Sequence, residues 1–167
     1  MIVGWTGHRP DVFRDAVSAR REVERAADAL VGRWPEIEFV CGGQRGVDQW
    51  AATAAIARNV VFHVVLPIPA TGFARGWDPE ERRSLSAVLR RAASVEIVDP
   101  NRAEGPLAYD RRNEAVVRRC NLIAAVWTGI RRGGTFYTLC AARARGLAVE
   151  EWRLEPAGRI RVGGRGL

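Results

Sequence analysis

The chain has 167 residues, of which 47% are hydrophobic and 27% charged, as in an ordinary globular domain. It carries a formal net charge of +7, and no apolar run approaches the roughly 20 residues that a membrane-spanning helix needs. Cys41, Cys120 and Cys140 lack the spacing of zinc ligands or of a disulfide framework. We therefore expect one cytoplasmic domain over residues 1–167, with reduced thiols, no metal site and no membrane contact.

Strand-like and helix-like segments alternate along the first hundred residues. Apolar residues recur at helical spacing from Val23 to Trp34 and stop before Pro35. Asp78-Pro79-Glu80-Glu81 has the N-cap, proline and acidic first turn of a helix start. The other predicted elements are strands at 2–6, 36–41, 60–66 and 95–98, a helix at 47–58 and a loop at 67–77.

The last third of the chain repeats this alternation. A helix is predicted from Tyr109 to Cys120, followed by a fully apolar strand from Leu122 to Trp127. Gly133-Gly-Thr135 then opens an alanine-rich helix, and 148–154 is the next strand. The turn at 155–158 predicts an antiparallel edge strand over 159–162. This pattern of βα units predicts an α/β protein with three layers, α/β/α, around a mostly parallel sheet.

Three of the predicted strands end in polar or glycine-rich turns, at Thr6–Pro10, Gly42–Asp48 and Thr128–Thr135. In open α/β sheets, ligands bind beyond the carboxyl ends of the strands. A glycine-rich turn before a helix directs backbone N–H groups and the positive end of the helix dipole at one ligand, most naturally a phosphate. The sequence therefore predicts a binding site formed by these three turns.

These turns resemble those of the SLOG superfamily of Rossmann-like nucleotide-binding domains. The superfamily includes the lonely-guy phosphoribohydrolases, the DNA-processing protein DprA and the YpsA-like proteins. Thr6-Gly-His-Arg-Pro10 is similar to the opening motif of the YpsA-like branch, and the segments 42–52 and 109–138 resemble its later motifs. The resemblance covers most of residues 2–150. It implies a Rossmann-like fold, a nucleotide or nucleotide-derived ligand, no further cofactor and a homodimer.

The chain departs from the phosphoribohydrolase motif at its acidic pair. Gly134-Thr135 matches the Gly-Thr step of that motif, but the two acidic positions fall on Tyr137 and Thr138. Neither side chain can stabilise an oxocarbenium-like centre as a carboxylate does. The resemblance thus implies that the phosphate-binding half is kept, with Arg112 as the counterpart of the family's arginine. Asp48 and Arg112 are the candidate catalytic residues if hydrolysis occurs.

We expect Gly133, Gly134 and Thr135 to hold the phosphate with help from Arg112, and Gly42 and Gly43 to permit close backbone approach. Asp48 and His8 are expected as polar contacts. The complete predicted set is Thr6, Gly7, His8, Arg9, Gly42, Gly43, Asp48, Arg112, Asn113, Gly133, Gly134 and Thr135.

Two other functions stay open. The first is a hydrolase that cleaves a glycosidic or related bond of a nucleotide with Asp48. The second is a nucleic-acid binder that uses its arginine surface. The paired arginines are spread along the whole chain rather than gathered in one stripe. This favours a solvated basic surface and a small nucleotide ligand over a nucleic-acid partner.

Overall fold

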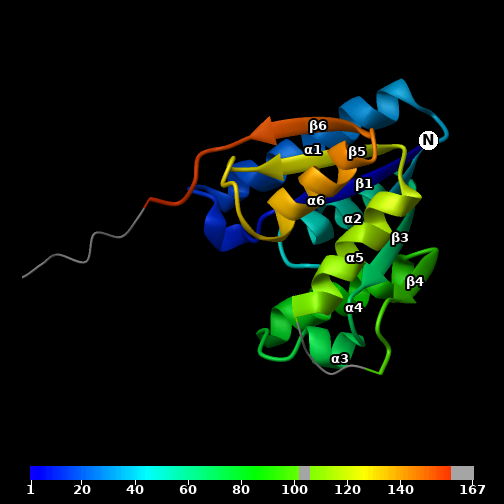
Figure 1. The fold of residues 1–167 in the computed structure, drawn as a ribbon, viewed down its shortest axis with the longest axis vertical. Helices are drawn as coiled ribbons and strands as arrows, with labels where there is room; N and C mark the ends of the chain where they lie inside the picture. Colours follow the sequence, from blue (N-terminus) through cyan, green and yellow to red (C-terminus); the bar gives the residue numbers. More distant parts are fainter. Residues whose placement is uncertain (102–105, 159–167) are drawn as a thin grey trace, which may run out of the picture.

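The centre of the molecule is a six-stranded, wholly parallel sheet (Figure 1). We describe it from a computed structural model, which covers residues 1–101 and 106–158 of the chain. The strand order is β4-β3-β2-β1-β5-β6. The strands are β1 (Ile2–Gly7), β2 (Glu38–Cys41), β3 (Val61–Leu66), β4 (Ser94–Ile97), β5 (Leu122–Trp127) and β6 (Ala148–Arg153).

Helices cover both faces of this sheet, as a parallel sheet requires. Helices α5 and α6 lie in front of the sheet in Figure 1, and α1 and α2 lie behind it. The long helices are α1 (Ala16–Arg33), α2 (Val47–Ala57), α4 (Pro79–Arg91), α5 (Pro106–Arg119) and α6 (Gly133–Ala144). Two short helical turns, η1 (Pro10–Val12) and α3 (Ala70–Phe73), complete the described elements.

The apolar core is divided by the sheet into two layers. One layer holds Trp5, Phe39 and Leu30 with the buried sides of α1, α2 and α4. The other holds Ile123 and Leu139 with the buried sides of α5 and α6. Every residue of β5 is buried, because helices cover this central strand from both sides. This burial fixes the carboxyl end of β5 relative to that of its neighbour β1.

The order of the strands reverses at β1. The chain builds β1 to β4 outward on one side, then returns through α5 to place β5 against the other edge of β1. Such a reversal is a topological switch point, where the loops after the two neighbouring strands diverge and leave a crevice. The loops after β2, β1 and β5 follow adjacent strands and surround this crevice.

The predicted α/β/α class and parallel sheet are confirmed. The helix start at Asp78 is confirmed as well, because its carboxylate accepts from the Glu81 N–H at 2.8 Å in a capping box. The prediction that 67–77 is only a loop was wrong, since α3 lies within it and buries Phe73. The predicted antiparallel edge strand at 159–162 lies outside the described residues. None of the helices within residues 1–101 and 106–158 is long and apolar enough to cross a bilayer.

Candidate functional site

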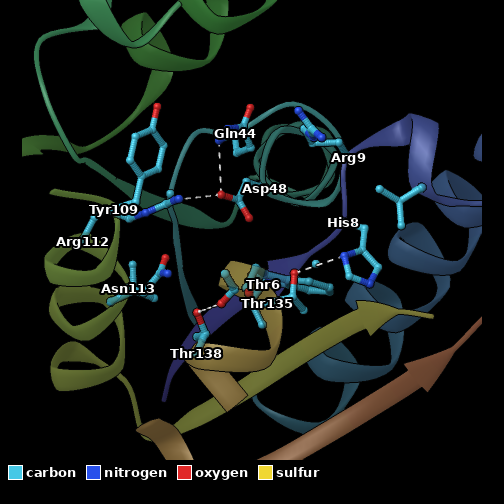
Figure 2. A pocket seen from close by; sticks show the side chains of 16 residues that line it. Thr6, His8, Arg9, Gln44, Asp48, Tyr109, Arg112, Asn113, Thr135 and Thr138 are labelled. Carbon is cyan, nitrogen blue, oxygen red and sulfur yellow. Dashed lines mark hydrogen bonds and ion pairs between the residues drawn. The ribbon is translucent and has the colours of Figure 1, made fainter. Parts of the chain in front are cut away.

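A cavity of about 270 Å³ opens at the switch point, beyond the carboxyl ends of β1, β2 and β5. Figure 2 shows the side chains that line it. Thr6, Thr135 and Thr138 gather at one end, Gln44 and Tyr109 lie at the other, and Asp48 with Arg112 lies between them. The cavity thus has a hydroxyl-rich end and an end with a charged pair and an aromatic ring.

Two glycines allow the turn after β1 to meet its neighbours closely. A Cβ on Gly7 would lie 2.3 Å from the Val126 carbonyl oxygen and 2.4 Å from a Val47 methyl group. Gly46 has φ +88°, and a Cβ there would lie 2.4 Å from the His8 carbonyl oxygen. Contacts this short exclude any side chain. The turn after β1 is therefore held closely against the end of β5 and against the turn after β2.

The first turn of α6 forms the hydroxyl-rich end of the cavity. Gly134, Thr135 and Thr138 line it, and the preceding residue Arg132 makes no side-chain capping bond to the helix. The Thr138 hydroxyl donates to the Gly134 carbonyl oxygen at 2.8 Å. The first backbone N–H groups of a helix have no partner inside the helix, and the dipole adds positive potential there. This end of the cavity suits an anion.

His8 orients this end from the turn after β1. Its Nδ1 lies 3.4 Å from the Thr135 hydroxyl oxygen, and Figure 2 shows the imidazole beside the cavity. The ring packs against Phe13 and Trp127, with centroids 5.8 and 6.3 Å away. Burial lowers the pKa of His8 below its ordinary value of 6.5. The neutral imidazole is therefore the form that the folded protein favours.

This lowered pKa predicts a loss of stability in acid. The unfolded chain takes up a proton at His8 at higher pH than the folded chain. The stability due to neutral His8 is therefore fully present above about pH 6.5 and is lost as the pH falls through the lowered pKa. Urea unfolding from about pH 7.5 to about pH 5 should show a steeper loss for the wild type than for His8→Gln. Equal slopes for the two proteins would contradict this assignment.

A buried ion pair forms the middle of the cavity. Arg112 Nη1 donates to Asp48 Oδ2 at 3.1 Å, and both side chains are less than one-tenth exposed. Asp48 Oδ2 also accepts the Gln44 N–H at 3.2 Å. Burial raises the pKa of the Asp48 carboxyl, and the Arg112 guanidinium opposes this shift. Arg112 Nε is buried and has no hydrogen-bond partner in the described part of the chain.

Gly42 makes room for this ion pair. A Cβ on Gly42 would lie 1.1 Å from Arg112 Nη1 and 2.7 Å from Asp48 Oδ2. The guanidinium therefore occupies the space that any larger residue at position 42 would fill. The sequence predicted that Gly42 and Gly43 admit the ligand to the backbone. Gly42 also lines the cavity, so its close approach to a ligand stays a prediction beside this contact with the protein's own arginine.

The structure brings most of the predicted residues to this one cavity. Gly43 and Gly133 do not line it. Both have positive φ, +72° and +80°, so they shape the turns before α2 and α6. The predicted residues that line the cavity are Thr6, Gly7, His8, Arg9, Gly42, Asp48, Arg112, Asn113, Gly134 and Thr135.

Several lining residues were not in the predicted set. Thr138 lies one turn after Thr135 on the same face of α6, and Tyr109 lies one turn before Arg112 on α5. This i, i+3 spacing was the signal that could have found them. Trp5 and Gln44 also line the cavity. The sequence held no such signal for Trp5, because an apolar residue within a strand usually belongs to the core. In the structure Trp5 is indeed 1% exposed, although it also lines the cavity.

No family model matches the chain. In sequence, it is 24% identical over 160 residues to UPF0398 proteins of Bacillus thuringiensis (strain Al Hakam) and Bacillus cereus (strain Q1). Each alignment covers 87% of this chain and 84% of the relative. The similarity therefore extends over most of both proteins.

Solved structures with the same fold include two DNA processing proteins A. The protein from Helicobacter pylori, described for its single-stranded DNA binding mode, has a TM-score of 0.69 at 14% identity over 94% of this chain and 68% of its own. The Streptococcus pneumoniae protein has a TM-score of 0.64 at 18% identity and 89% coverage. This chain spans about half the length of the latter, 49%. The chain thus has the Rossmann-like fold of DNA processing protein A and resembles UPF0398 proteins in sequence.

Proposed function

We propose that the cavity binds a nucleotide or nucleotide-derived ligand, with a phosphate at the first turn of α6. The observation that carries this proposal is the position of Gly134 and Thr135 at a helix start, facing a cavity at the switch point. The helix supplies backbone N–H groups and positive potential without a competing side-chain cap. Thr6 adds a hydroxyl group at the same end, whereas the Thr138 hydroxyl donates to the Gly134 carbonyl oxygen.

The middle of the cavity suits the sugar and the base of such a ligand. Arg112 Nε and Trp5 Nε1 are buried donors with no hydrogen-bond partner among the described residues, and both side chains line the cavity. We assign the second carboxylate oxygen of Asp48 to a ribose hydroxyl, since Oδ2 is the oxygen that binds Arg112. Buried donors without partners cost about 1–3 kcal/mol each, so a ligand that accepts from them gains affinity.

The sequence resemblance supports the same ligand class. The strand-end turns resemble those of the SLOG superfamily, and the Rossmann-like fold agrees with that membership. We assign the chain to the YpsA-like branch and propose that it acts in the cytoplasm as a nucleotide sensor or regulator. Binding without turnover is the simpler assignment because the acidic pair of the phosphoribohydrolase motif is Tyr137 and Thr138 here.

A thermal-shift panel of nucleoside monophosphates, followed by calorimetry on the best ligand, tests this proposal. A ligand at 100 times its dissociation constant adds about 2.7 kcal/mol to the stability of the folded state. We expect a saturable shift with a nucleoside monophosphate and a smaller shift with the matching nucleoside. Equal shifts with and without the phosphate would contradict the phosphate site.

Hydrolysis of a nucleotide is a second candidate function, favoured by one observation. Asp48 is the sole carboxylate among the described residues that line the cavity, which is where such a reaction needs an acid or base. Our preferred proposal predicts that AMP releases no adenine above background. Release of adenine by the wild type that Asp48→Asn abolishes would establish the hydrolase instead.

We further propose that the protein is a homodimer, as the superfamily resemblance implies. Closed two-fold dimers are the commonest soluble homo-oligomers. Light scattering at micromolar concentration should give about twice the chain mass of 18.4 kDa. A monomer mass under these conditions would disprove the dimer and leave the ligand site untouched, because every residue of that site comes from one chain.

A further inference from the structure

A second cavity of about 300 Å³ adjoins the first. Arg9, Gln44 and Tyr109 line both cavities and so form their common wall. In Figure 2, these three residues lie on the side away from Thr6, Thr135 and Thr138. The second cavity therefore continues the first beyond the end that is opposite to the phosphate position at α6.

The sizes of the two cavities favour one ligand that spans both. Ligand sites in proteins have volumes of about 300–1,000 Å³. The first cavity, at about 270 Å³, lies just below that range, and the second, at about 300 Å³, lies at its lower limit. Together they fall well within it. A ligand longer than a nucleoside monophosphate would use the combined space.

The second cavity is rich in arginine. Arg9, Arg45 and Arg75 line it, and no carboxylate is among its described lining residues. Glu81 pairs with Arg45 at 2.7 Å from outside the cavity, and Asp11 lies 3.8 Å from Arg9. Guanidinium groups around a concave surface favour anions, and the carboxylates of Asp11 and Glu81 offset part of this effect. The planar donor sets of guanidinium groups also match phosphate oxygens.

Arg45 is held in place for such a contact. Its guanidinium lies 5.4 Å from the centre of the Trp77 ring, and Nη1 donates to Glu81 Oε1. The same Glu81 takes part in the capping box that starts α4. Arg45 Nε is buried and has no hydrogen-bond partner among residues 1–101 and 106–158. A pre-oriented guanidinium loses little side-chain entropy on binding an anion.

Aromatic rings form the wall between the arginines and the first cavity. Tyr109 is half-buried, and its ring centre lies 6.0 Å from that of Phe73. Phe73 in turn packs on Trp77 at 5.1 Å. Bases of nucleic acids and nucleotides stack on exposed aromatic faces whatever their sequence. Tyr109 is therefore placed for contact with a planar group of a ligand that spans the two cavities.

We propose that the second cavity binds a second phosphate, so that the ligand is a 5′-phosphorylated dinucleotide. This inference rests on the proposed function, since its first phosphate lies at α6. The second, internucleotide phosphate lies among Arg9, Arg45 and Arg75, and the first nucleoside contacts Tyr109. The dinucleotide is either a free small molecule or the 5′ end of a single strand.

Calorimetry with AMP and with 5′-phosphoryl-ApA tests the second site. The dinucleotide should bind the wild type at least about tenfold more tightly than AMP, because charge-assisted hydrogen bonds are the strong ones. Arg45→Met and Arg75→Ala should each remove most of this gain and leave the affinity for AMP within about twofold. Retained AMP binding also shows that the variants fold. Arg83→Ala, an exposed arginine on α4 outside both cavities, removes the same charge and should change neither affinity.

Equal wild-type affinities for the two ligands would overturn the second site and leave the proposed function standing. The second site would also be overturned if both Arg45→Met and Arg75→Ala still bound the dinucleotide about tenfold more tightly than AMP. Failure of both ligands to bind would disprove the proposed function itself.

A 5′-phosphorylated ten-nucleotide strand distinguishes a free dinucleotide from the 5′ end of a single strand as the ligand. Similar affinity for strand and dinucleotide indicates the small molecule, whereas tighter binding with a steeper salt dependence indicates a strand.

Discussion

Replacing Gly134 with aspartate is expected to abolish nucleotide binding while the protein stays folded. The new carboxylate would lie at the first turn of α6, where the proposed phosphate binds. Two unit charges about 4 Å apart repel by about 4 kcal/mol at an effective dielectric constant near 20. Every 1.4 kcal/mol is a factor of about ten in affinity. We therefore expect calorimetry to show a loss of at least about 100-fold.

The fold should tolerate this change. Gly134 is exposed, and a Cβ there would meet one atom of the described residues, Asn113 Nδ2, at an ordinary contact distance of 3.5 Å. An acidic residue in the first turn of a helix is stabilising by about 0.3–1 kcal/mol through the helix dipole. Gly134→Asp should thus bind the nucleotide more weakly while it unfolds at equal or higher urea concentration.

Gly134→Asn is the matched control, because its side chain has almost the same size without the charge. We expect it to weaken binding less than Gly134→Asp does. If a folded Gly134→Asp protein binds nucleoside monophosphates with the wild-type affinity, the first turn of α6 is not the phosphate site.

Replacing Arg112 with methionine is expected to be strongly destabilising. The change removes the partner of Asp48, which is 6% exposed and then keeps, among the described residues, the backbone donors of Gln44 and Gly42. Removing one member of a buried ion pair costs about 3–5 kcal/mol, because the other charge stays buried without compensation. Urea unfolding should show a loss of this size in the free energy of unfolding. That is a large part of the total stability of a typical domain, about 5–15 kcal/mol.

A double-mutant cycle separates the ion pair from simple loss of packing. Asp48→Asn in the Arg112→Met background removes the uncompensated carboxylate and should restore part of the lost stability. The two changes would then be non-additive, with an interaction energy of about 0.5–3 kcal/mol. Strict additivity, or a loss below about 1 kcal/mol for Arg112→Met alone, would contradict a structural role for this pair.

The positions of the three turns could be predicted from the sequence because each depends on local chemistry. Glycine-rich segments after Thr6, Cys41 and Trp127 mark the ends of apolar strands, whatever the order of those strands. Alternation of strand and helix then implies that these ends share one edge of a parallel sheet. The fold class and the edge of the sheet that carries the candidate site follow from these two local signals.

The contacts inside the site could not be predicted in the same way. Asp48 and Arg112 are 64 positions apart in the sequence, and they meet because α5 crosses back over the sheet to the switch point. That crossing depends on strand order, which no local pattern contains. The need for glycine at position 42 depends on the same contact, because the Arg112 guanidinium occupies the space that a side chain there would fill. The short helix α3 was missed because four residues are too few to display helical periodicity.

A crystal structure with adenosine 5′-thiomonophosphate tests the central claim most directly. Its sulfur atom marks the phosphate in an anomalous difference map. We predict a sulfur peak at the first turn of α6, with the phosphate oxygens within hydrogen-bond distance, about 2.7–3.2 Å, of backbone N–H groups near Gly134 and Thr135. A bound ligand whose sulfur peak lies elsewhere on the protein would contradict the claim that this helix start is the phosphate site.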